Sequence, residues 1–191
     1  VGLILDALEA SGHADNTIVI YISDHGDWLG DHGLILKGPM HYDGLLKVPM
    51  ILRGPGVPAG ARVDDPVSTL DLLPTFAELA GAAPLQTAHG ASLKPLWEGQ
   101  GHRDFAMNEW ELLPTRTGVA LSLRTVRTAT RKLTVDLRSG AGELYDLQAD
   151  PHELANLWDN PDARDVQADL MDLIHSRPDD MRPNQPQVGM A

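Results

Sequence analysis

The chain has 191 residues and a mass of 20.7 kDa, which is enough for one to one and a half globular domains. Its 27 acidic and 15 basic residues give a net charge of −12, which argues against nonspecific nucleic-acid binding and against docking on an anionic membrane. There is no cysteine, so disulfides, zinc–thiolate sites and a cysteine nucleophile are excluded within these residues. No apolar run approaches the length of a membrane span.

The first hundred residues have the pattern of an α/β domain. Apolar residues at positions 1, 4, 5 and 8 follow helical spacing, so the chain starts inside an amphipathic helix, and we expect further sequence upstream. The β-branched run 17–23 is apolar on both faces and predicts a central parallel strand buried on both sides. A second strand is expected over 47–53, where Pro49 indicates an edge or a bulge. A helix is expected over 71–80, with Asp71 as its cap.

The sequence pattern changes after about residue 100. Short segments rich in strand-forming residues, separated by Gly and Pro turns, predict an antiparallel sheet of strands at 105–110, 119–127, 132–137 and 143–147. Apolar residues at helical spacing predict a final helix over 161–175. The predicted organisation is therefore an α/β part over 1–100, a small antiparallel sheet with a packing helix over 101–176, and an extended tail over 177–191.

The residues that carry chemistry follow the first predicted strand. Asp24 and His25 come where that strand ends, and Gly26 allows a sharp turn. Open α/β sheets bind ligands at the carboxyl ends of their strands, so this carboxylate and imidazole can face one metal ion. Twelve residues after His25, Lys37 adds a cation, and a metal with a fixed ammonium forms an anion-binding set. The alternatives are a surface turn and a solvated lysine.

Other candidates have structural alternatives of equal or greater weight. His41 follows Lys37 closely and could bind substrate, although a structural loop residue is the simpler interpretation. The strand end at 108–110 could reach the mouth of the pocket or be exposed. A basic cluster over 124–132 is interpreted as solvated strand faces.

These motifs together resemble the C-terminal portion of a sulfatase, in the alkaline phosphatase superfamily. The resemblance runs from about residue 1 to residue 175, and its specific part is the segment from Asp24 to Lys37. Further matching runs are Leu-Gly-Asp-His-Gly at 29–33, Gly-Glu-Leu-Tyr-Asp-Leu at 142–147 and Asp-Pro-His-Glu-Leu-Ala-Asn-Leu at 150–157.

The resemblance implies an alkaline-phosphatase-like α/β fold and hydrolysis of small-molecule sulfate esters. It implies that Asp24 and His25 are ligands of one divalent cation and that Lys37 contacts the sulfate. Calcium is the expected ion, and the histidine makes manganese the alternative. The family nucleophile is a formylglycine made in a Cys/Ser-x-Pro-x-Arg motif, and the chain contains no such motif. We therefore expect the nucleophile and the other metal ligands in a missing N-terminal part of the same protein.

Three other functions remain open at this stage. A phosphonate monoester or phosphodiester hydrolase of the same superfamily resembles the same motifs, since sulfate and phosphate are both tetrahedral anions. A noncatalytic fragment is the second alternative, because the nucleophile is absent. Two-zinc phosphatase chemistry is the third and would need further ligands. The organic part of the substrate and the cellular compartment are not predicted.

Overall fold

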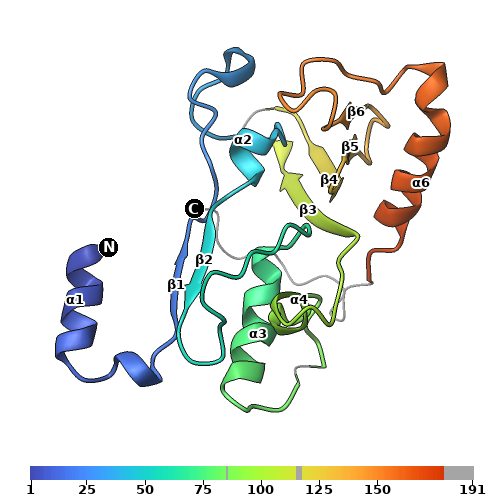
Figure 1. Cartoon of the computed structure of the whole chain (residues 1–191). Coiled ribbons are helices and arrows are strands. Elements are labelled where there is room, and N and C mark those ends of the chain that lie inside the picture. Colours follow the sequence, from blue (N-terminus) through green and yellow to red (C-terminus); the bar gives the residue numbers. More distant parts are fainter. Residues whose placement is uncertain (85, 115–117, 179–191) are drawn as a thin grey trace.

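The computed structural model describes residues 1–84, 86–114 and 118–178, so most of the predicted tail lies outside the described residues. The first part of the chain contains two strands and several helices (Figure 1). The elements are α1 (Gly2–Ala10), β1 (Val19–Ile22), α2 (Asp43–Leu46), β2 (Met50–Arg53), α3 (Leu72–Leu79) and α4 (Lys94–Trp97), with single 3-10 turns at Ala14–Asn16 and Asp31–Gly33. No described helix has the length and apolar character needed to span a membrane.

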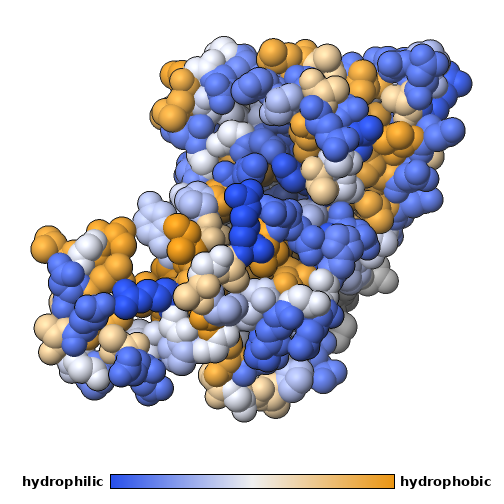
Figure 2. Space-filling view, viewed as in Figure 1, coloured by the Kyte–Doolittle hydropathy of each residue, from blue (hydrophilic) through white to orange (hydrophobic). Residues whose placement is uncertain are grey.

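The pairing direction and the burial of the first strand differ from the prediction. β1 pairs antiparallel with β2, with Tyr21 opposite Ile51, and these are the only two strands of this sheet among the described residues. Both side chains are largely exposed, at 48% for Tyr21 and 61% for Ile51. The expectation of a parallel strand buried on both sides is wrong here, because the chain folds back through residues 23–49 and no described element covers that face. Leu3 and Ile4 of α1 are also largely exposed, and apolar surface gathers at the left edge of the view in Figure 2, where α1 lies.

The helix α3 is confirmed, but its start is built differently. Ser68 caps a preceding 3-10 turn, Thr69–Asp71, in a capping box with Asp71. Asp71 is only 1% exposed, and its carboxylate accepts bonds from the backbone N–H groups of Ser68 and Ala91 and from the Arg103 guanidinium. Asp71 is therefore a buried junction between three segments and not a simple cap of α3.

The second part of the chain confirms the predicted strands and helix. The strands β3 (Phe105–Leu112), β4 (Leu121–Thr128), β5 (Arg131–Asp136) and β6 (Gly142–Asp146) form an antiparallel sheet in the order of the sequence. A 3-10 turn capped by Asn160 leads into α6 (Arg164–His175), which packs against β4 and β5 (Figure 1). The core between sheet and helix consists of Val126, Leu133, Val135, Leu144, Ala163, Leu170 and Ile174.

Candidate active site

Asp24, His25 and Lys37 come together in the structure as the sequence predicts. The Nζ atom of Lys37 lies 2.9 Å from Nε2 of His25, and that nitrogen lies 3.4 Å from Oδ2 of Asp24. The backbone N–H of His25 donates to Oδ1 of Asp24 at 3.0 Å. This hydrogen bond is the main cause that lowers the pKa of Asp24 below its usual value. The carboxylate is therefore ionised at neutral pH and exposed to ligands.

The His25 ring has a defined orientation. Its Nδ1 lies 2.7 Å from the carbonyl oxygen of Gly26, so this nitrogen carries the proton and donates. The lone pair of Nε2 then faces Asp24 and Lys37. A backbone carbonyl on one ring nitrogen is the usual way in which proteins orient a metal-binding histidine.

The Asp24–His25 pair fits part of the coordination shell of a divalent cation. Two ligands about 2.4 Å from a cation and about 90° apart are separated by about 3.4 Å, which matches the separation of the two donor atoms. No cluster of three or more His, Cys, Asp or Glu side chains able to hold a metal occurs in residues 1–84, 86–114 and 118–178. The pair alone would therefore supply at most two of the six or more ligands that calcium takes.

The loop that carries these residues has a rigid centre. Trp28 is 5% exposed and packs against Gly38, and its backbone N–H donates to the Leu36 carbonyl at 3.1 Å. Gly26 packs directly on α2: its N–H donates to the Leu45 carbonyl at 2.7 Å, and a Cβ there would overlap the carbonyl of Gly44. This packing fixes both ends of the segment between His25 and Lys37.

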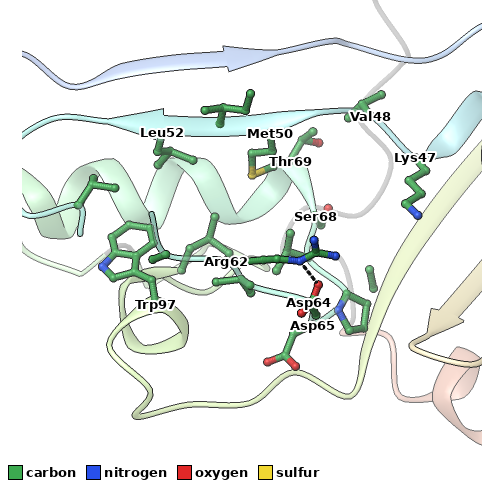
Figure 3. Close-up of a pocket in the computed structure, with 18 of the residues that line it drawn as sticks. Lys47, Val48, Met50, Leu52, Arg62, Asp64, Asp65, Ser68, Thr69 and Trp97 are labelled. Atoms are coloured by element: carbon green, nitrogen blue, oxygen red, sulfur yellow. Dashed lines mark hydrogen bonds and ion pairs between the residues drawn. The ribbon is translucent and has the colours of Figure 1, made fainter. Parts of the chain in front are cut away.

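The site opens into a broad cleft of about 1700 Å³ between the β1–β2 pair, the segment 54–69 and strand β3. Figure 2 shows the hollow between the two halves of the molecule, and Figure 3 shows one wall, with Lys47 and Trp97 at its opposite ends. Most basic groups on this lining are neutralised locally. Arg53 pairs with Glu9, Arg62 with Asp64 and Arg127 with Asp43.

The substrate-binding role predicted for His41 has no support in this geometry. The side chain is 2% exposed, Nδ1 lies 2.7 Å from Oγ1 of Thr125, and the ring meets Trp110 edge-on with centroids 6.2 Å apart. Burial, and then the charge of Lys132, lower the pKa of His41 to about 4. The ring is therefore neutral at pH 7 and holds the loop against the sheet, as the structural alternative has it.

A buried ionic cluster, which sequence reasoning missed, anchors the same loop. Lys132 on β5 is 1% exposed and forms an ion pair with Glu153, which is also buried. The Lys132 ammonium also donates to the His41 carbonyl at 2.7 Å and lies 3.4 Å from Asp43. Asp43 in turn pairs with Arg127 at 3.1 Å, and its N–H donates to Glu153.

This cluster corrects the interpretation of the basic residues at 124–132 as solvated strand faces. The sequence feature that could have predicted the buried cluster is the alternation of β5, where Lys132 and Thr134 share one face and Leu133 and Val135 share the other. All four are buried, so the polar face needed a polar partner. Glu153 lies in the run 150–157, which the sequence analysis used only as part of the family resemblance.

The residues at the strand end 108–110 were predicted either to reach the mouth of the pocket or to be exposed, and they differ from one another. Asn108 and Trp110 line the cleft. Glu109 pairs instead with Arg124 at 2.9 Å and with Arg177.

Comparison with known proteins places this chain in a family. Residues 30–179 match the family model described as N-sulphoglucosamine sulphohydrolase, C-terminal. The chain belongs to the sulfatase family. It corresponds to a C-terminal portion and is 34% identical over 192 residues to the Delta 4,5-hexuronate-2-O-sulfatase of Bacteroides thetaiotaomicron, covering 95% of this chain and 40% of the relative.

Solved structures confirm the expected alkaline-phosphatase-like fold of this sulfatase portion. A structure in complex with its substrate D-glucosamine-2-N,6-O-disulfate superposes with a TM-score of 0.78 and 31% identity, over 91% of this chain and 36% of the other. The phosphonate monoester hydrolase of Agrobacterium radiobacter superposes with a TM-score of 0.81 and 32% identity, over 92% and 37%. The chain spans 31–40% of the length of the first four curated relatives.

Proposed function

We propose that this chain forms the cation- and anion-binding half of the active site of a sulfatase that hydrolyses sulfate esters. The observation that carries the proposal is the convergence of Asp24, His25 and Lys37 at the edge of an open cleft. Two relatives are named for sulfated sugars, a hexuronate 2-O-sulfate and a glucosamine disulfate, so a sulfated sugar is the proposed substrate class.

Asp24 and His25 would hold one divalent cation, with calcium as the proposed ion and manganese as the alternative. The bound cation would neutralise charge on the oxygens of the sulfate. Nε2 of His25 has one lone pair, so it cannot bind a cation and accept from Lys37 together. With that nitrogen taken up by a cation, the Lys37 ammonium would lose this acceptor, and it would then be able to turn toward the cleft and hold a sulfate oxygen.

The proposed nucleophile is a formylglycine supplied by sequence outside the 191 residues. The chain has no cysteine and no Ser-x-Pro-x-Arg motif from which one could be made. The longer relatives support this division, and further metal ligands would come from the same outside region.

The test is a comparison of two ester classes with the full-length protein. We expect turnover of 4-nitrophenyl sulfate, and a fall in kcat/KM of about 100-fold or more in Lys37→Ala, as for other groups that hold transition-state charge. Asp24→Ala should lower the affinity for calcium, measured by calorimetry. The matched control is Lys94→Ala, which removes an ammonium that pairs with Glu98 and does not line the cleft.

A phosphonate monoester hydrolase is the second candidate function. The observation that favours it is the similarity to the Agrobacterium radiobacter enzyme, which is as close in fold and identity as the sulfatases. Turnover of a phenylphosphonate monoester without turnover of any sulfate ester would establish this candidate and exclude the first.

A further inference from the structure

We infer that one face of strand β3, together with Lys47, is a binding subsite for the sugar ring of the substrate, an inference that rests on the proposed function. The residues that define this β3 subsite are Asn108, Trp110 and Lys47. All three line the same cleft as Asp24, His25 and Lys37.

The alternation of β3 puts the right side chains on the cleft face. Ala106, Asn108 and Trp110 are spaced two residues apart and all line the cleft, whereas Glu109 forms ion pairs with Arg124 and Arg177. Among the described residues, β3 is one of the two edge strands of its sheet. A small residue, an amide and an indole therefore stand in a row along one wall of the cleft.

The polar groups of this subsite are unused by the protein itself. Within the described parts of the chain, neither the Asn108 amide nor the Lys47 ammonium forms a side-chain hydrogen bond or ion pair. The arginines on the same lining differ, because Arg53, Arg62 and Arg127 are each paired with a carboxylate. The unpaired groups are thus available to a ligand.

The chemistry of the three groups matches a charged sugar. An indole presents a flat apolar face with little conformational entropy to lose, which suits the C–H face of a pyranose ring. An amide can donate to and accept from ring hydroxyl or N-acyl groups. An ammonium attracts a second anionic group, such as a uronate carboxylate or another sulfate.

The indole of Trp110 packs against a buried ring. The buried His41 ring meets it edge-on, and His41 is itself bonded to Thr125 on the neighbouring strand β4. Because His41 follows Lys37 by four residues, the same loop positions both the sulfate-binding lysine and the indole. A preformed platform of this kind lowers the entropic cost of binding a ring.

The test compares a large and a small sulfate ester on the full-length protein. The sugar probes are D-glucosamine 6-O-sulfate and a heparin-derived disaccharide with a 2-O-sulfated uronate, and the small probe is 4-nitrophenyl sulfate. We expect Asn108→Ala and Trp110→Ala to lower kcat/KM for a sugar probe by about 10–100-fold and to change that of the small ester by less than about threefold. Trp110→Phe should restore part of the loss, and Lys47→Met should affect the disaccharide most.

The control is Glu109→Gln, which lies on the same strand but does not line the cleft. This variant should change kcat/KM neither for the sugar probes nor for the small ester. Equal losses for both esters in Asn108→Ala and Trp110→Phe, or no loss for either, would overturn the subsite. So would a wild-type protein that cleaves 4-nitrophenyl sulfate but neither sugar probe, and this result would leave the proposed hydrolysis of sulfate esters intact. Cleavage of none of the sulfate esters overturns the proposed function and the subsite together.

Discussion

The pair formed by Lys132 and Glu153 permits a quantitative prediction of stability. Both side chains are almost fully buried, at 1% and 4% exposed. In Glu153→Gln the Lys132 ammonium loses its nearest counter-charge and keeps the His41 carbonyl and Asp43, which it shares with Arg127. Breaking a buried pair from one side costs about 3–5 kcal/mol, because it leaves an uncompensated charge. We expect a loss of that size in the free energy of unfolding of the full-length protein, measured by urea denaturation.

The double variant separates the pair from its surroundings. Lys132→Met with Glu153→Gln removes both charges, so it should cost less than the sum of the two single variants by about 1–3 kcal/mol. The two single costs would add to within about 0.5 kcal/mol if the side chains did not interact. Additivity of that kind would refute the reasoning. Activity toward 4-nitrophenyl sulfate, measured on the same variants, reports whether the Lys37 loop moves when its anchor is weakened.

Two further predictions concern the same loop. Since burial holds the pKa of His41 at about 4, below its usual 6.5, the unfolded state binds more protons between these values, and stability falls by about 3 kcal/mol as pH drops from 6.5 to 4. His41→Gln should flatten this part of the pH–stability curve, whereas the exposed His13→Gln should not, and an unchanged slope in His41→Gln would contradict the assignment. Gly26→Ala should lower the free energy of unfolding by about 1–3 kcal/mol because its Cβ overlaps the Gly44 carbonyl. Gly2→Ala, which meets no atom within 4 Å, is the control, and equal melting temperatures for the two variants would disprove the tight contact.

The parts of the molecule predicted well are those governed by local rules. The four strands of the second sheet are separated by short turns, so the pairing of neighbours in sequence follows from the spacing of Gly and Pro. The helix α6 follows from its apolar stripe. Asp24, His25 and Lys37 lie within fourteen residues of one another, so a single compact loop brings them together.

The parts predicted poorly depend on partners distant in sequence. The direction of β1 depends on where residues 50–53 return, and its apolar pattern is the same for either direction. The burial of Lys132 depends on Glu153 and on the loop at 41–43, about 90 residues earlier. A lysine beside an arginine has the pattern of a solvated face, and only the tertiary contact distinguishes the two cases.

The buried anchor also determines how this polypeptide responds to truncation. The three residues of this chain that are proposed to bind the cation and the sulfate, Asp24, His25 and Lys37, lie before position 40. The loop that carries them is nevertheless tied to β5 and to the turn at residue 153. A stop codon at position 130 would spare Asp24, His25 and Lys37 and still remove both Lys132 and Glu153. Nonsense and frameshift alleles that remove the residues after position 130 are therefore expected to be as damaging as substitutions in the site itself, because Lys132 and Glu153 anchor the loop that carries the site.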